Sequence, residues 1–235
     1  MLKVYHGSTE VIKKPILELS KPHNDYGRGF YCTEDIELAK EWACKSNLNG
    51  IVNVYNLDIS SLKVLYLNSD KYSVLNWIAI LLNNRVFDAP NPTAKITKDY
   101  IIENYSIDLS SYDVIIGYRA DDSYFSYAID FINNSLSIQS LSKALKLGKL
   151  GYQTVLISEN AFYKLEFVKS INVEKHKYYK KYCNRDKQAR ADYISLKNEL
   201  VDLSSEKYIL DIIRENTKIW LIRMKKCIYM MQRDI

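Results

Sequence analysis

Apolar and polar residues alternate in several short runs over residues 1–170, and this alternation predicts β-strands. The first run, residues 2–6, stops at Gly7-Ser8, which indicates a strand that enters a turn. A second short strand is expected directly after the turn Gly27-Arg28-Gly29. Similar alternation and β-branched content predict further strands at 50–58, 63–67, 112–118, 153–157 and 165–168.

Between these runs the apolar residues recur at helical spacing. Ile36, Ala39 and Trp42 follow Thr33-Glu34-Asp35, residue types that are typical of a helix start, so a helix is expected from about 36 to 44. The same reasoning predicts further helices at 70–86, at 97–104, from the cap at 120–123 to about 133, at 138–147 and at 159–163. Strands at both ends with helices inserted between them indicate an α+β fold rather than a regular βαβ alternation.

The composition changes after about residue 173. No Gly or Pro follows Gly151, and the tail is rich in Lys, Glu, Leu and Ile. Apolar residues recur there at roughly helical steps, which predicts helices near 174–201 and 204–232. We therefore divide the chain into a domain of residues 1–172 and a basic α-helical extension, 173–235.

Composition excludes several classes of protein. Of the 235 residues, 47% are hydrophobic and 26% are charged, which is the usage of an ordered globular chain and not of a disordered one. No run of about 18 apolar residues occurs, so we expect no membrane span, and the N-terminus lacks the pattern of a secretion signal, so we expect no secretion. The four cysteines and three histidines show no zinc-ligand spacing, and we expect a cytoplasmic protein with reduced thiols and no metal.

The net charge of +5 resides in the tail. Residues 1–170 hold 18 Lys and Arg against 19 Asp and Glu, whereas 171–235 hold 15 against 9. A basic tail can follow RNA, DNA or an acidic partner. Because its lysines are interspersed with acidic residues, a solvated helix face is the alternative, and this interpretation is favoured.

Three short motifs in the first 42 residues acquire their meaning from their order. They are His6-Gly7-Ser8, Gly27-Arg28-Gly29-Phe30-Tyr31, and Trp42, which lies 11 residues after Tyr31. This series resembles the signature of the ADP-ribosyltransferase superfamily, in its poly(ADP-ribose) polymerase and diphtheria-toxin-like branch. Polymerases of that branch carry His-Gly-Ser, Gly-Lys-Gly-Ile-Tyr-Phe and a second Tyr at the same step. The resemblance extends over residues 1 to about 170.

The chain also resembles a family of uncharacterised bacterial proteins, many of which resemble toxins of toxin–antitoxin pairs. Members share Gly-Lys/Arg-Gly-Phe-Tyr, Ala-Asp-Asp and a late Gln, which correspond here to the motif ending at Tyr31, to Ala120-Asp121-Asp122 and to Gln153. The resemblance implies an ADP-ribosyltransferase-like split β-sandwich with inserted helices, followed by the C-terminal helical extension.

The resemblance implies that NAD is the substrate. Tyr31 and Trp42 would enclose the cationic nicotinamide ring, although core packing is the alternative role of such aromatics. The backbone of Gly7 and the hydroxyl of Ser8 would meet the carboxamide. His6 would bind a ribose hydroxyl. Arg28 would meet the pyrophosphate, or would be a solvated loop residue.

The late motif departs from the polymerase pattern. Gln153 stands where polymerases carry an acidic residue that contacts the ribose beside the scissile bond. An amide can bind a hydroxyl but cannot act as a general base, so polymer elongation is not expected. A carboxylate supplied by Asp121 or Asp122 would complete the catalytic set of His6, Tyr31 and Gln153; a helix cap is the alternative role of these acids.

These features predict a mono-ADP-ribosyltransferase that modifies a macromolecular acceptor, protein or nucleic acid, and acts as a bacterial toxin with a small antitoxin partner. Two alternatives stay open because of Gln153: an inactive or weakly active NAD-binding module, and an NAD glycohydrolase. A third is a nucleic-acid-binding protein built around the basic tail.

Overall fold

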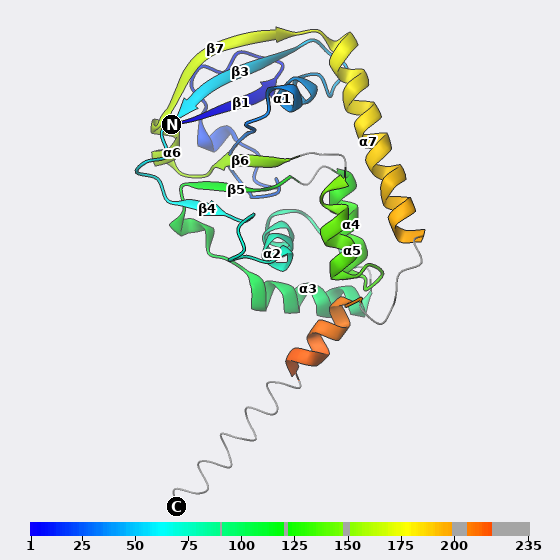
Figure 1. Cartoon of the computed structure of the whole chain (residues 1–235). Coiled ribbons are helices and arrows are strands. Elements are labelled where there is room, and N and C mark those ends of the chain that lie inside the picture. Colours follow the sequence, from blue (N-terminus) through cyan, green and yellow to red (C-terminus); the bar gives the residue numbers. More distant parts are fainter. Residues whose placement is uncertain (90, 120–121, 148–150, 199–205, 218–235) are drawn as a thin grey trace, which may run out of the picture.

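The computed structural model describes residues 1–89, 91–119, 122–147, 151–198 and 206–217, and its strands form two sheets (Figure 1). The first sheet is antiparallel and has the order β1 (Leu2–Ser8), β3 (Gly50–Leu57), β7 (Leu165–Val173). The second has the order β2 (Phe30–Cys32), β6 (Tyr152–Leu156), β5 (Val114–Tyr118), β4 (Val64–Tyr66). In this sheet β4 and β5 run parallel and the other pairs antiparallel. The α+β class expected from the sequence is confirmed.

The two sheets pack face to face around one hydrophobic cluster. Its residues come from both inner faces and include Val4, Tyr55 and Leu57 of the first sheet and Phe30 and Ile116 of the second. Strand alternation explains this, because every second side chain of a strand lies on the same face. The edges of the sheets are also joined: Tyr5 of β1 and Thr33, just after β2, exchange two backbone hydrogen bonds of 2.8 and 3.0 Å.

Helices cover the two outer faces (Figure 1). α1 (Ile36–Ala43) packs on the first sheet through Ala39 and Ala43 against Val52 and Val54. The second sheet is covered by helices that share a large cluster around Trp77, Ile115 and Phe131; these are α2 (Val74–Asn84), α3 (Pro92–Tyr105), α4 (Asp122–Ile132) and α5 (Ile138–Ala144). α6 (Glu159–Tyr163) and the short 3₁₀ turns η1 (Leu17–Leu19) and η2 (Leu109–Ser111) complete the described elements of the domain.

The start of α3 and the end of β7 each differ from the sequence prediction by five residues. α3 begins at Pro92, because the side chain of Asn91 accepts a hydrogen bond from the Ala94 amide (2.8 Å) and proline suits the first helical position. α1 begins at Ile36 as expected, and its cap is Asp35, whose carboxylate accepts from the amides of Glu37 and Leu38. β7 runs to Val173, five residues beyond the prediction. A register shift opposite Val54 and Tyr55 interrupts the alternation of apolar and polar residues in β7, so the sequence pattern does not reveal the end of the strand.

α7 (Lys175–Asn198) runs along the side of the molecule from the first sheet to the helical layer (Figure 1). Its first half contacts α1, where the Arg185 guanidinium donates to Glu41 at 2.6 and 2.8 Å. Its second half contacts α4: the ring of Tyr193 stacks on Tyr127 with centroids 3.8 Å apart, and its hydroxyl donates to Asp130 at 2.6 Å. Both halves of α7 therefore pack on residues 1–172.

Several basic side chains of α7 form ion pairs within the molecule. Lys181 pairs with Glu37 at 3.2 Å, and Lys197 pairs with Asp130 at 3.0 Å. A second helical segment, 209–217, buries Ile209 in the cluster that covers the second sheet. The rest of the predicted last helix, 218–232, lies outside the described residues. Within the described ranges, no helix is long and apolar enough to cross a membrane.

The contact between α7 and α1 gives a stability prediction. Arg185→Ala leaves the buried Glu41 carboxylate without its cation, and we expect the free energy of unfolding to fall by about 1–3 kcal/mol. Urea titration followed by circular dichroism measures the change. Lys187→Ala, an exposed position on the same helix, is the matched control. Equal unfolding midpoints for the two variants would show that the ion pair does not hold α7 in place.

Candidate functional site

A cavity of about 760 Å³ opens where the two sheets, α1 and α7 meet. Its wall contains five residues to which the sequence analysis gave a role in binding or catalysis: His6, Gly7, Tyr31, Trp42 and Gln153. They come from β1, β2, α1 and β6, so only the fold brings them together. The volume lies within the usual range for small-molecule sites.

His6 is held in one tautomer. Its Nδ1 lies 2.7 Å from the backbone oxygen of Tyr31, and a carbonyl oxygen only accepts, so Nδ1 carries the proton. The imidazole stacks on Phe30 with ring centroids 4.3 Å apart. Burial lowers the pKa of His6, with the bond to Tyr31 acting in the opposite direction. The ring is therefore neutral at pH 7, and Nε2 is left as an acceptor for a ligand hydroxyl.

The hydroxyl of Tyr31 fixes the preceding turn. It donates to the Gly27 carbonyl at 2.7 Å and accepts from the Tyr26 amide at 3.0 Å. Gly27 has φ +76°, a conformation that favours glycine. Burial raises the pKa of Tyr31, so the phenol stays protonated. With its hydroxyl engaged in this way, Tyr31 adds an aromatic ring to the cavity wall rather than a titrating group.

Trp42 already carries a cation on its ring. The Arg119 guanidinium carbon lies 3.5 Å from the indole centroid, and both residues line the cavity. The buried Trp42 Nε1 has no hydrogen-bond partner among the described residues. Arg119 follows β5 and precedes the Ala-Asp-Asp motif, but nothing in the sequence indicated that it would reach Trp42. This face of Trp42 is thus suited to a flat, positively charged group.

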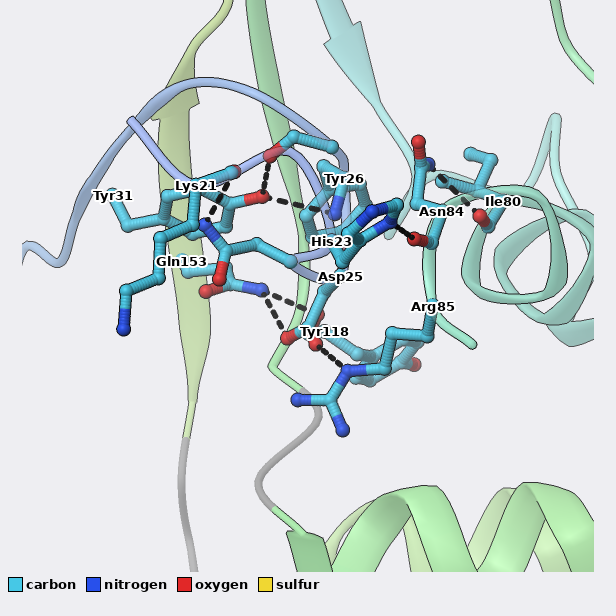
Figure 2. A network of polar contacts seen from close by, with 12 residues as sticks. Lys21, His23, Asp25, Tyr26, Tyr31, Ile80, Asn84, Arg85, Tyr118 and Gln153 are labelled. Atoms are coloured by element: carbon cyan, nitrogen blue, oxygen red, sulfur yellow. Dashed lines mark hydrogen bonds and ion pairs between the residues drawn. The ribbon is translucent and has the colours of Figure 1, made fainter. Parts of the chain in front are cut away.

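Gln153 belongs to a buried polar cluster with Asp25 and Arg85 (Figure 2). Its amide nitrogen donates to the Asp25 carboxylate at 3.1 Å and to the Tyr118 carbonyl at 3.3 Å. Arg85 Nε lies 2.8 Å from the other Asp25 oxygen. Asp25 is only 6% exposed. Sequence reasoning missed Asp25 because an acidic residue in a Pro- and Asn-containing loop is ordinarily a solvated turn residue.

Gly7 and Ser8 both have structural roles: Gly7 lines the cavity and also packs against α1, whereas Ser8 lies outside the cavity lining. A Cβ on Gly7 would lie 2.3 Å from the Ala39 carbonyl oxygen, so glycine is required for the packing of β1 on α1. Ser8 is not among the residues that line the cavity; its hydroxyl accepts from Asn53 Nδ2 at 3.1 Å and from the Glu10 amide at 3.2 Å. These bonds anchor the loop after β1.

Arg28 and the Asp pair do not contribute described side chains to the cavity. Arg28 is exposed, and its guanidinium donates to the backbone oxygens of Glu18 (3.0 Å) and Ser20 (2.7 Å), so it braces the η1 loop. Asp121 and the side chain of Asp122 lie outside the described residues, although Asp122 begins α4.

The cavity wall is electropositive. Among the described lining residues six carry positive charge and three carry negative charge: Lys14, Lys21, Lys45, Arg85, Arg119 and Arg190 against Glu10, Asp25 and Asp186. α7 contributes Tyr182 together with the Asp186–Arg190 ion pair of 2.9 Å. An anionic ligand, such as one with a pyrophosphate group, is favoured by this balance.

A family model described as "Protein of unknown function (DUF3990)" matches residues 2–167. The chain belongs to this family. No curated protein and no solved structure matches the chain. The matched segment includes every strand except the end of β7, and it stops before the part of the cavity wall that α7 provides.

The burial of His6 predicts how stability depends on pH. Its pKa in the folded protein lies below the ordinary value of 6.5, so the unfolded chain binds more protons at mildly acidic pH. The free energy of unfolding should therefore fall as the pH drops from 7.5 to 5.5, by at most about 1.4 kcal/mol per pH unit from this group.

Urea unfolding of the wild type and of His6→Gln at both pH values measures the effect. We expect the substitution to reduce the loss of stability at pH 5.5. His176→Gln removes an exposed histidine of α7 and is the control. A pH dependence that is the same in His6→Gln and wild type would contradict a lowered pKa of the half-buried His6 imidazole.

Proposed function

We propose that the protein is an NAD-dependent mono-ADP-ribosyltransferase. The observation that carries this proposal is the shared cavity of His6, Tyr31, Trp42 and Gln153, which the fold assembles from residues up to 147 positions apart. These are the residues that the resemblance to the superfamily assigns to NAD. Their convergence in one electropositive cavity supports the proposal more strongly than any single motif does.

For ADP-ribosyl transfer, the main task of the protein is to bind NAD and the acceptor in a suitable geometry. The bond between nicotinamide and ribose breaks with its electron pair going to the nicotinamide, which leaves as a neutral molecule. The ribose carbon becomes cationic in character and is trapped by a nucleophile of the acceptor, which gives up its proton. Holding the two reactants in a fixed geometry supplies much of the rate enhancement for such a step.

Each cavity residue has a role in this scheme. The rings of Tyr31 and Trp42 contact the nicotinamide, and the flat guanidinium of Arg119 on Trp42 supports the affinity of that ring for a flat cation. Binding of nicotinamide to this face requires displacement of the Arg119 guanidinium, which lies 3.5 Å from the ring centroid. Nε2 of His6 accepts from a ribose hydroxyl. Gln153 contacts the ribose beside the scissile bond.

An amide at position 153 favours transfer of a single ADP-ribose group, because it cannot deprotonate a further sugar hydroxyl to extend a polymer. The acceptor is a protein or a nucleic acid. The resemblance to toxin families supports a cytoplasmic toxin with a small antitoxin protein as its partner. Asp122, at the start of α4, is the candidate for a carboxylate that activates the acceptor.

The aromatic contacts give a binding prediction. Tyr31→Ala and Trp42→Ala should each weaken NAD binding by about 1–3 kcal/mol, because each removes a ring from the nicotinamide site. Isothermal titration calorimetry measures the affinity, and circular dichroism confirms that the variants are folded. Tyr163→Ala, whose side chain is 83% exposed, is the control. If both folded variants bind NAD as the wild type does, the cavity is not the NAD site.

The activity itself is tested with purified protein, NAD labelled in its adenylate half, and a bacterial lysate. We expect release of nicotinamide and label on a macromolecule, both lost in His6→Ala and retained in His176→Ala. Digestion with protease or nuclease identifies the acceptor class. Nicotinamide release without label transfer would indicate an NAD glycohydrolase instead of a transferase. Binding of NAD without release of nicotinamide would indicate an NAD-binding module.

A further inference from the structure

The orientation of the Gln153 amide is dictated by its neighbours. The amide lies against an Asp25 oxygen at 3.1 Å and the Tyr118 carbonyl oxygen at 3.3 Å, and both of these atoms only accept hydrogen bonds. The NH₂ group must face them, because the reverse orientation would place oxygen against oxygen. The amide oxygen of Gln153 then points away from Asp25, as Figure 2 shows.

Asp25 is itself held by groups on several elements. Arg85, directly after α2, binds one carboxylate oxygen at 2.8 Å, so the other is directed at Gln153. The next residue, Tyr26, donates from its hydroxyl to the Tyr118 carbonyl at 2.7 Å, and its amide donates to the Tyr31 hydroxyl at 3.0 Å. A Cβ on Gly117 would lie 2.3 Å from the Tyr26 hydroxyl, so glycine there makes room for this arrangement.

We propose that Asp25 is a positioning residue that holds the Gln153 amide with its oxygen toward the cavity, as the acceptor for a hydroxyl of the bound ligand. This inference rests on the proposed function for the identity of that ligand: the hydroxyl belongs to the ribose of NAD that carries the nicotinamide. Arg85 acts with Asp25, because its guanidinium binds the carboxylate oxygen that does not face Gln153 and so holds the carboxylate in place.

This arrangement offers an explanation for the absence of an acidic residue at position 153. A carboxylate at position 153 would offer the ligand an acceptor oxygen, and the oriented amide offers one too. The carboxylate is instead provided by Asp25, which accepts a hydrogen bond from the Gln153 amide nitrogen. The amide of Gln153 then requires the carboxylate of Asp25 as its partner. In relatives of this protein, we expect a substitution at one of the two positions to be accompanied by a substitution at the other.

Two substitutions separate the positions. Asp25→Asn provides a donor as well as an acceptor beside Gln153, so the amide is free to turn over and the cavity loses its fixed acceptor. Gln153→Glu places a second carboxylate at hydrogen-bond distance from Asp25, and repulsion raises the pKa of one of the two acids. The combined variant Asp25→Asn/Gln153→Glu restores one amide and one carboxylate with their positions exchanged.

The experiment measures NAD affinity by calorimetry and the free energy of unfolding in urea for the wild type and these three variants. We expect each single substitution to weaken NAD binding about tenfold and the exchanged pair to return within about threefold of the wild type. Unfolding should show the same non-additivity, because the two side chains are in contact. Asp70→Asn, an exposed acid, is the control.

The outcomes distinguish this inference from the proposed function. Additive effects on unfolding, or wild-type NAD affinity in a folded Asp25→Asn variant, would overturn the positioning role. If Asp25→Asn alone does not fold, the comparison of Gln153→Glu with the exchanged pair decides: a pair no better than Gln153→Glu contradicts the proposal. If the wild type binds no NAD, the proposed function fails, whereas the unfolding cycle still reports on Asp25 and Gln153.

Discussion

The site depends on the contact between β1 and the strand β2, which belong to different sheets. Tyr5 and Thr33 exchange backbone hydrogen bonds there, and the next residue, His6, binds the backbone oxygen of Tyr31 at 2.7 Å. Because this contact joins the sheets at one edge, it sets the distance between the imidazole and the phenol ring. The cavity opens beside it, and the sandwich core around Phe30 and Tyr55 supports it from behind.

The same residues illustrate what a sequence can and cannot predict. Most strands and helices could be predicted from the periodicity of apolar residues. The register shift in β7 interrupts this periodicity, so its last five residues were not predicted. The start of α3 was placed too late, because the helix begins directly after the cap residue Asn91. His6, Tyr31, Trp42 and Gln153 were predicted because their order resembles a known signature. Their assembly in one cavity required the fold.

Other parts of the site had no signal in the sequence. Asp25 and Arg85 are 60 positions apart and meet only through the turn at Gly27 and the end of α2. Arg119 reaches Trp42 across the gap between β5 and α1. Gly7 was expected to allow close approach of a ligand, and the fold adds a second requirement, because a side chain there would clash with the Ala39 carbonyl oxygen of α1. In each case the tertiary neighbour, and not the residue type, decides the role.

The lengthwise course of α7 has a consequence for how the chain can be divided. Tyr182, Asp186 and Arg190 line the cavity, while Arg185 and Tyr193 fasten the same helix to α1 and α4. The helix therefore both lines the cavity and connects α1 with α4, although it lies beyond the segment that the family model matches. Relatives that share residues 2–167 but carry a different C-terminal helix would enclose the same motifs within a differently shaped binding site.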